Sequence, residues 1–297
     1  MLKNTVLSMD TFRSLFCTRK NLQVKAITPS QLIAKLNIFL LVLFSVYSAE
    51  CNAHDFWLAA HGKTSPGNTV SISARAGSEW PGKQVVRSEG MVEYFKLFYG
   101  NGSQWDDING HDNSFVFGHY KVKENATQMA LLKTNNYELN LPAEEFNQYL
   151  EEEDLQEAID YRKNNNLTET ESFELFSRIA KIHPRVVDNS SLNKTYNLPF
   201  EITLANISSE GNARSHIQVM LSKANKPVIN KRIKAFCQGS EKLYYSKTND
   251  KGLATFEIDK QGVWTFSSVE LTHLYHGSYQ WQSIWTSLTL TLPVHNK

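Results

Sequence analysis

Apolar and polar residues alternate in short segments along most of the chain after residue 53, which is typical of β-strands with one buried face. In the first half, segments 69–76, 93–100, 115–122 and 137–141 show this alternation, and turn-forming residues separate them. Seven further candidate strands lie at 199–205, 216–221, 231–236, 242–246, 254–258, 263–271 and 284–294. Short strands separated by turns predict a C-terminal immunoglobulin-like or transthyretin-like β-sandwich.

The pattern changes to helical spacing at Pro142. Beyond this proline, acidic residues come first and apolar residues recur every three or four positions, at Phe146, Tyr149, Leu150, Leu155 and Ile159. A second helix is predicted from the capping-box pair Thr168 and Glu171, an apolar stripe at positions 173, 176, 179 and 180, and a stop at Pro184. We therefore expect a mainly β fold with a helical insertion over residues 142–183.

The first 53 residues differ from the rest in charge and hydropathy. They hold six basic and two acidic residues, a balance of +4, whereas the whole chain carries +1 and the remainder therefore −3. The twelve residues 36–47 are nearly all apolar, which is too short for a membrane span of about 20 residues and typical of a signal-peptide core. Because Cys51-Asn52-Ala53 has the small-x-small pattern of a cleavage site, we expect a cleaved signal peptide and a periplasmic or secreted protein. The alternative is an uncleaved signal that anchors the protein in the membrane.

The sequence thus predicts three regions: a signal peptide at 1–53, a β domain with the helical insertion at 54–190, and a β-sandwich domain at 191–297. A mean hydropathy of −0.39 excludes a multi-pass membrane protein, so we expect membrane contact only through the signal segment. The net charge of +1 gives no electrostatic case for a nucleic-acid partner. Beyond the signal the only cysteine is Cys237, which we expect to be a buried apolar side chain.

Several sequence motifs with known chemistry are absent: GxxxxGK[ST], GxGxxG, HExxH, CxxC and GxSxG. Without a local signature for nucleotide binding, zinc proteolysis or serine hydrolysis, we expect a non-enzymatic protein.

His54 is the residue with the clearest chemistry, because cleavage after Ala53 would make it the first residue of the mature chain. An α-amine has a pKa of about 7.7–8.0, so a metal ion displaces its proton readily at neutral pH. The amine and the imidazole Nδ1 of His54 can then bind one ion, and such nitrogen ligands suit Ni(II) or Cu(II). A further nitrogen ligand is expected from His273 or His276, which are three residues apart in a predicted loop. His61, His119 and His183 are other possible partners. A histidine at a processing boundary can also be a purely structural residue.

Two other functions are compatible with the sequence. Trp281 and Trp285 have a four-residue spacing that places both on one strand face, where they would either pack between sheets or form an exposed platform. An exposed pair would favour a metal-free binding or scaffold module for a protein or a cell-surface glycan. The third function is a copper oxidase of polysaccharides that uses a histidine brace at His54.

The chain resembles a bacterial family of exported proteins of unknown function that are labelled NikM-like or nickel uptake transporter family proteins. The resemblance covers nearly all of residues 54–293 and is most specific at its two ends, in the opening HDFW (54–57) and the closing WQSIWTSLT (281–289). Between them it includes Pro66-Gly67, Ala76-Gly77, Pro81-Gly82, Leu141-Pro142-Ala143, Phe176-Ser177-Arg178, Asp250-Lys251-Gly252 and Gly262-Val263-Trp264. Asp154 departs from the family pattern, in which a glycine is common at this position.

This resemblance implies a role in handling a divalent transition metal, without naming the metal or its ligand set. Together with His54, it leads us to expect a periplasmic accessory protein that captures or delivers nickel, cobalt or copper. The expected partner is a metal-uptake membrane transporter.

Overall fold

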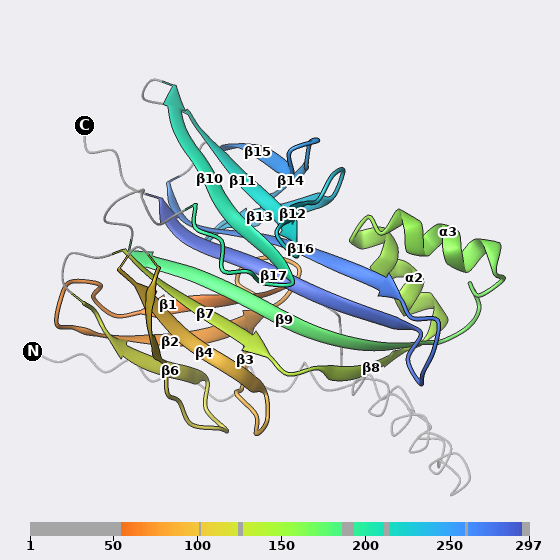
Figure 1. Ribbon diagram of the computed structural model, residues 1–297, viewed down its shortest axis with the longest axis horizontal. Coiled ribbons are helices and arrows are strands. Elements are labelled where there is room, and N and C mark those ends of the chain that lie inside the picture. Colours follow the sequence, from red (N-terminus) through yellow and green to blue (C-terminus); the bar gives the residue numbers. More distant parts are fainter. Residues whose placement is uncertain are drawn as a thin grey trace, which may run out of the picture. The chain divides into compact units, whose positions relative to one another are not determined.

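The computed structural model describes residues 55–100, 102–123, 127–185, 193–210, 214–258 and 261–292. The predicted signal peptide and His54 lie outside the described residues. The described residues form three β-sheets and two helices, so the predicted fold class, a mainly β protein with sandwich packing, is confirmed (Figure 1).

The central sheet has nine strands in the order β14-β13-β16-β17-β9-β7-β4-β5, and β8 also pairs with β9. Only the β9–β17 pair within it is parallel. The bounds are β4 Val92–Tyr99, β5 Gln104–Asp107, β7 Gln128–Thr134, β8 Tyr137–Leu141, β9 Ser172–Arg185, β13 Arg232–Cys237, β14 Leu243–Lys247, β16 Gly262–His273 and β17 Trp281–Leu292. The sheet therefore includes strands from both sides of the boundary expected at residue 190.

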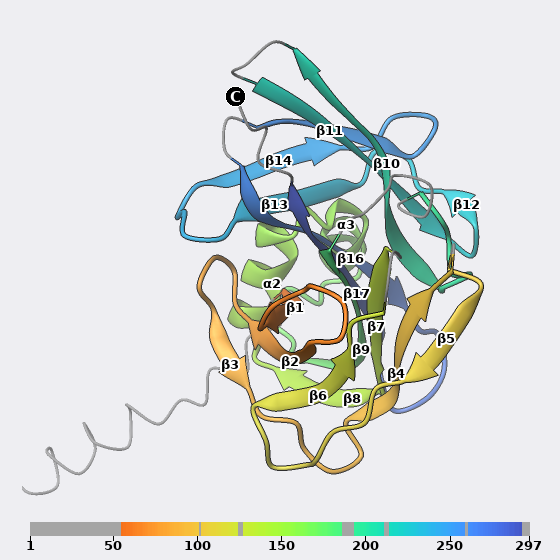
Figure 2. The ribbon, with the colours of Figure 1, turned by 90° about the vertical axis from the view of Figure 1, so that its left-hand side faces the viewer.

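Two four-stranded sheets pack against this central sheet. The N-terminal sheet contains β1 Phe56–His61, β2 Thr69–Ala76, β3 Lys83–Val85 and β6 Val116–Lys121. The C-terminal sheet contains β10 Phe200–Glu210, β11 Arg214–Lys223, β12 Lys226–Pro227 and β15 Leu253–Ile258. In Figure 2, β10 and β11 lie in the upper part and β1, β2 and β6 in the lower part, with strand β16 of the central sheet between them.

Alternate residues of β17 show which layer covers each face of the central sheet. Leu288 and Leu290 are in a hydrophobic cluster with the C-terminal sheet. Trp281 and Trp285 point to the opposite face, where they pack against the helices. On that same face the N-terminal sheet packs over Ala180 of β9. One face is therefore shared by the helices and the N-terminal sheet, while the C-terminal sheet covers the other.

The helical region differs from the expected insertion in two ways. The first predicted helix is two helices, α2 Ala143–Glu152 and α3 Gln156–Asn164. The break contains Asp154, whose φ of 56° is the left-handed conformation that favours glycine at a helix end. The departure from the family pattern thus lies at a position where glycine would be less strained.

The second predicted helix is wrong, because residues 172–185 form strand β9. The apolar stripe at 173, 176, 179 and 180 reflects a strand that is covered on both faces, not one face of a helix. Glu174 lies between these apolar residues and Lys181 directly follows them, and both are buried with a polar partner, which removes the alternation that would have indicated a strand.

Cys237 at the end of β13 is 2% exposed and belongs to the core of the C-terminal sandwich, as expected. None of the helices among the described residues has the length and hydropathy needed to cross a membrane.

Candidate functional site

The candidate site lies where the first strand meets the central sheet. Strand β1 contacts β9 and β17 on the face that it shares with the helices. Beneath its start, one register row across the central sheet consists of Lys234, Ser267, Ser287 and Ala180. The next row consists of Phe236, Thr265, Thr289 and Ile182. The first row is thus mainly polar although all four of its residues are buried.

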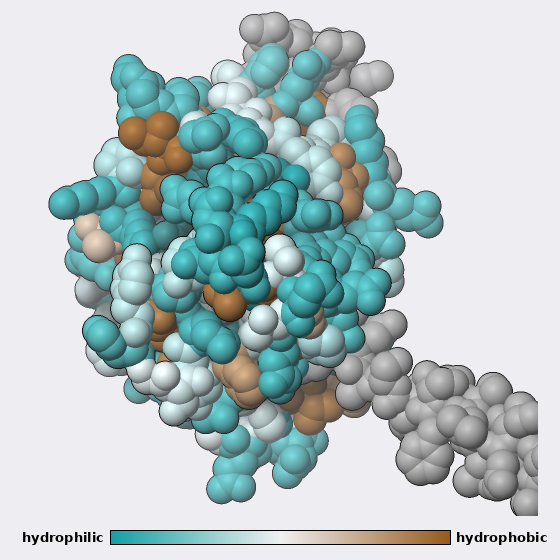
Figure 3. All heavy atoms as spheres, turned by 90° about the vertical axis from the view of Figure 1, so that its right-hand side faces the viewer, coloured by the Kyte–Doolittle hydropathy of each residue, from teal (hydrophilic) through white to brown (hydrophobic). Residues whose placement is uncertain are grey.

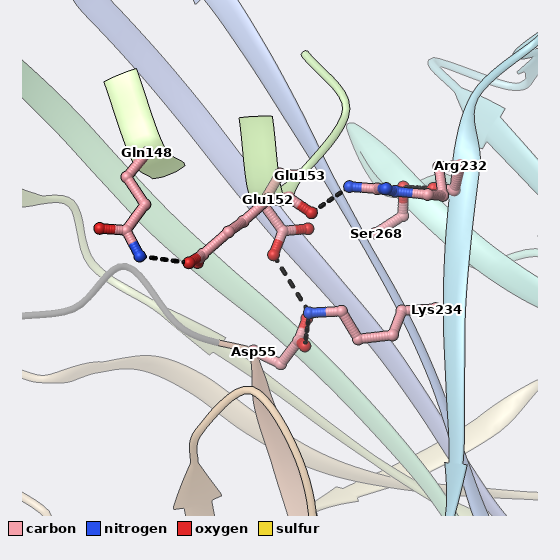
Figure 4. A network of polar contacts seen from close by, with 7 residues as sticks. All are labelled: Asp55, Gln148, Glu152, Glu153, Arg232, Lys234 and Ser268. Carbon is pink, nitrogen blue, oxygen red and sulfur yellow. Dashed lines mark hydrogen bonds and ion pairs between the residues drawn. The ribbon is translucent and has the colours of Figure 1, made fainter. Parts of the chain in front are cut away.

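Lys234, the charged residue of the first row, connects three separate parts of the chain (Figure 4). Its ammonium group donates to Asp55 Oδ2 at 2.7 Å and to Glu153 Oε1 at 3.1 Å. Asp55 precedes β1, Glu153 follows α2, and Lys234 lies on β13. Asp55 is 1% exposed and Lys234 7%, so the contact is shielded from bulk water. A single ammonium group therefore holds the first strand, the end of a helix and the central sheet together.

The Asp55 cluster places two carboxyl groups around one ammonium group, and the charge of Arg232 also acts on Glu153. Two carboxylates share one ammonium group, and Asp55 Oδ1 is buried with no hydrogen-bond partner among the described residues. Burial, and then the charge of Asp55, raise the pKa of Glu153 to about 7, against the opposing effect of Lys234. Burial alone would lower the pKa of Lys234, but the two carboxylates raise it. The arrangement can therefore accept one more cation or hydrogen-bond donor at Asp55.

The end of α2 also contributes partial negative charge near Glu153, because the last carbonyl groups of a helix carry partial negative charge. Arg232 donates to the backbone carbonyl of Glu152, and its own carbonyl accepts a hydrogen bond from Ser268 at 2.8 Å. The Glu152 side chain turns away and accepts a 2.6 Å hydrogen bond from Gln148 (Figure 4). Arg232 thus fixes the helix end, while Glu153 faces Lys234.

The position of Asp55 is set by the strand that it precedes. The backbone N–H of Gly77 donates to the Asp55 carbonyl at 3.0 Å, and Phe56 and Trp57 are almost completely buried. These contacts give Asp55 little freedom to move. His54 is bonded directly to Asp55, so their α-carbons are about 3.8 Å apart. A mature chain that began at His54 would carry its α-amine on the residue next to Asp55, whose Oδ1 has no hydrogen-bond partner among the described residues.

The structure places the other two predicted ligands elsewhere. Lys234 is in register with Ser267, and His273 is six residues farther along β16, about 20 Å at the usual rise per residue. The His273 ring lies 4.0 Å from that of Tyr161 and 5.0 Å from that of Trp281, and burial lowers its pKa. His276 is exposed in the loop that follows.

No three histidine, cysteine or acidic side chains come together as a metal-binding group within the described ranges.

Trp281 and Trp285 do not form an exposed platform, because each is only 3% exposed. Trp281 packs on Phe146 with ring centroids 5.7 Å apart, and Trp285 stacks on Tyr149 at 5.7 Å. The face of the molecule that carries the helices shows mainly hydrophilic side chains with scattered hydrophobic ones (Figure 3). Because both side chains are buried, Trp281 and Trp285 do not provide the exposed platform that a metal-free glycan-binding module would need.

Two members of the Asp55 cluster were missed in the sequence. Glu153 belongs to an acidic run, 151–154, which predicts a solvated helix face. Its side chain is nevertheless only 12% exposed, because α2 ends at this point and the side chain is directed towards Lys234. Lys234 is one of several basic residues near β13, and only its position between the apolar residues Ile233 and Ala235 gave any signal of burial.

A second buried carboxyl lies under α2 and has a measurable consequence for stability. Glu174 is 0% exposed, accepts a hydrogen bond from the Ser283 hydroxyl, and has a second oxygen without a partner among the described residues. Burial raises its pKa to about 7, although Ser283 and Arg178 oppose the shift. Its folded-state pKa is thus above the unfolded value, so its contribution to stability is complete below about pH 4.5 and is lost as pH rises through about 7.

We predict that Glu174→Gln will remove this pH dependence. Between pH 4 and pH 9 the free energy of unfolding of the wild type should fall by about 3 kcal/mol relative to that of the variant. Denaturant titrations of both proteins across this range measure the difference. Parallel stability curves for the two proteins would show that Glu174 does not titrate in this way.

These features define the class of protein: a mainly β scaffold with two helices and a buried carboxylate–lysine cluster at the start of its first strand. The sequence model of one family, described as "Domain of unknown function (DUF4198)", matches residues 51–270, and the chain belongs to this family. No curated protein matches the chain.

Proposed function

We propose that this protein is exported and binds one divalent transition metal ion, Ni(II), Co(II) or Cu(II), at its processed N-terminus. The observation that supports this proposal best is Asp55 Oδ1, a buried carboxylate oxygen without a partner among the described residues. Buried polar atoms are rarely left unsatisfied, so an unpartnered one indicates a missing ligand or donor. A cation held by the neighbouring residue would supply the missing interaction.

The residues have separate roles in this proposal. His54 provides its α-amine and imidazole Nδ1, which together can hold one metal ion. Asp55 provides a carboxylate that Lys234 keeps in one orientation, at a Nζ–Oδ2 distance of 2.7 Å. Glu153 shares the same ammonium group and so helps to fix its position. Lys234 acts as the outer partner that orients a ligand, as metal sites commonly require.

Asp55 and His273 are on different parts of the molecule, so neither His273 nor His276 is included in this site. The His273 ring is already packed between aromatic rings, whereas Asp55 adjoins His54 in the chain. The proposed ligand set is therefore local to the N-terminus of the mature protein.

The biological role that we propose is that of a periplasmic accessory protein which captures or delivers the metal for a membrane uptake transporter. The signal-like segment at 1–53 and the resemblance to NikM-like proteins support this role. Membership of a family without a known function is compatible with it.

Isothermal titration of the metal-free mature protein with Ni(II), Co(II) and Cu(II) tests the proposal. We expect one high-affinity site, with at least a tenfold loss of affinity, about 1.4 kcal/mol, in His54→Ala and in Asp55→Asn. Chemical acetylation of the α-amine should have the same effect, because it removes one of the ligands. Affinity should also fall between pH 8 and pH 6, since protons compete for the amine and imidazole.

His276→Ala is the matched control, because it removes an exposed histidine away from Asp55 and should leave the affinity unchanged. Unchanged affinity in His54→Ala would rule out the proposed site. A loss in His276→Ala equal to that in His54→Ala would contradict a site that is local to the N-terminus.

A further inference from the structure

A cavity lies on the same face of the central sheet as the Asp55 cluster, one register row away. It is a cavity of ≈ 260 Å³ between β1 and the ends of β13, β16 and β17. Its lining includes the second register row, with Phe236, Thr265 and Thr289. Trp57 of β1 covers this row and packs edge-to-face on Phe236 at 4.9 Å. The cavity is thus one row away from Lys234, on the other side of an aromatic pair.

The lining combines aromatic and aliphatic side chains with polar ones and one full positive charge. Trp57, Trp80, Phe236 and Ile182 provide apolar surface, and Arg75 is the charged residue. None of the described residues that line the cavity is an aspartate or a glutamate. The electrostatic potential inside therefore favours an anion.

Arg75 is held in place by backbone carbonyl groups, and no carboxylate pairs with it among the described residues. Its Nη1 donates to the backbone carbonyl of Pro81 at 2.8 Å and to that of Gly82 at 3.4 Å, and its guanidinium lies 5.2 Å from the Trp80 ring. Its Nε is buried and has no hydrogen-bond acceptor among the described residues. A guanidinium with a fixed position and an unused donor is well suited to bind a planar anion such as a carboxylate.

The far side of the cavity offers a second hydrogen-bond donor. The hydroxyls of Thr265 and Thr289 are buried and are 3.1 Å from each other. Two hydroxyls that share one hydrogen bond leave one hydroxyl hydrogen free to donate. The cavity therefore presents donors among apolar walls, the usual composition of a small-molecule site.

We propose that this cavity binds a small organic carboxylate with an apolar body, whose carboxylate contacts Arg75 and whose body packs against Trp57, Trp80 and Phe236. The cavity of ≈ 260 Å³ has room for roughly nine water molecules at about 30 Å³ each, so the ligand is about the size of a single aromatic ring with a short acidic substituent. This site is independent of the proposed metal site, since it uses neither His54 nor Asp55.

Titration of the metal-free, ¹⁵N-labelled mature protein with benzoate and with its neutral analogue benzyl alcohol tests the inference. We expect benzoate to bind with a dissociation constant of about 1 mM or tighter, and benzyl alcohol to bind at least tenfold more weakly. Amide shifts should be confined to the cavity lining, including Ala59, Gln238 and Val263. Glucose, as a neutral polar probe, should bind more weakly than benzoate.

Arg75→Gln should reduce the affinity for benzoate to that for benzyl alcohol and leave the latter unchanged. Lys121→Gln, which removes the same charge from an exposed position on β6, is the matched control and should change neither affinity. Equal affinities of the wild type for benzoate and benzyl alcohol, shifts located elsewhere, or tighter binding of glucose would each overturn the proposal. These wild-type measurements decide the matter even if Arg75→Gln does not fold.

Discussion

Replacement of Lys234 by methionine is expected to lower the free energy of unfolding by about 3–5 kcal/mol. The ammonium group compensates two carboxylates at once, and Asp55 is 1% exposed. Without Lys234, the Asp55 carboxylate would remain buried with neither oxygen paired among the described residues. Chemical denaturation of the two proteins at pH 7 measures the loss.

The double variant Lys234→Met/Asp55→Asn tests whether the cause is the uncompensated charge. It should recover part of the stability, because the amide is neutral and costs less to bury. A loss below about 1 kcal/mol in the single variant would place this pair among ordinary surface ion pairs and contradict the buried cluster.

The second large effect is expected at Lys181, where methionine should also cost about 3–5 kcal/mol. Lys181 on β9 is 2% exposed and its Nζ lies 2.6 Å from Oε1 of Glu201 on β10, which is 0% exposed. Glu201 also accepts the backbone N–H of Tyr196 at 3.0 Å. Removal of the lysine would therefore leave a fully buried carboxylate whose remaining donor among the described residues is the backbone N–H of Tyr196.

The double variant Lys181→Met/Glu201→Gln should be more stable than Lys181→Met alone, because glutamine still accepts from Tyr196 and carries no charge. Lys223→Met is the matched control: its 2.7 Å pair with Glu270 is 48% exposed on the lysine side, so its loss should cost at most about 1 kcal/mol. Equal losses in the Lys181 and Lys223 variants would show that burial does not control the energy of these pairs.

The elements that were predicted correctly are those whose pattern depends on one buried face. Strand β2, for example, was predicted from the alternation and β-branched residues of 69–76 and has those same bounds. Strand β9 was predicted as a helix because it lies between two layers, and its buried polar residues interrupt any alternation. A single sequence carries no signal that distinguishes such a strand from a short helix.

The candidate site shows a similar division. His54 and its neighbour Asp55 stand out in the sequence because they follow a cleavage pattern. The Asp55–Lys234 pair could not be predicted, since its members are 179 residues apart and only the folding of β1 over β13 brings them together. Glu153 was likewise hidden in an acidic run, and its burial depends on where α2 ends.

Intact-mass measurement of the protein recovered from the exported fraction tests the central claim most directly. The claim is that processing exposes a histidine whose amine and ring lie next to the buried carboxylate of Asp55. The predicted mass is that of residues 54–297 with an unmodified N-terminus. Any other first residue, or a mass that includes the signal segment, would contradict the proposed metal site.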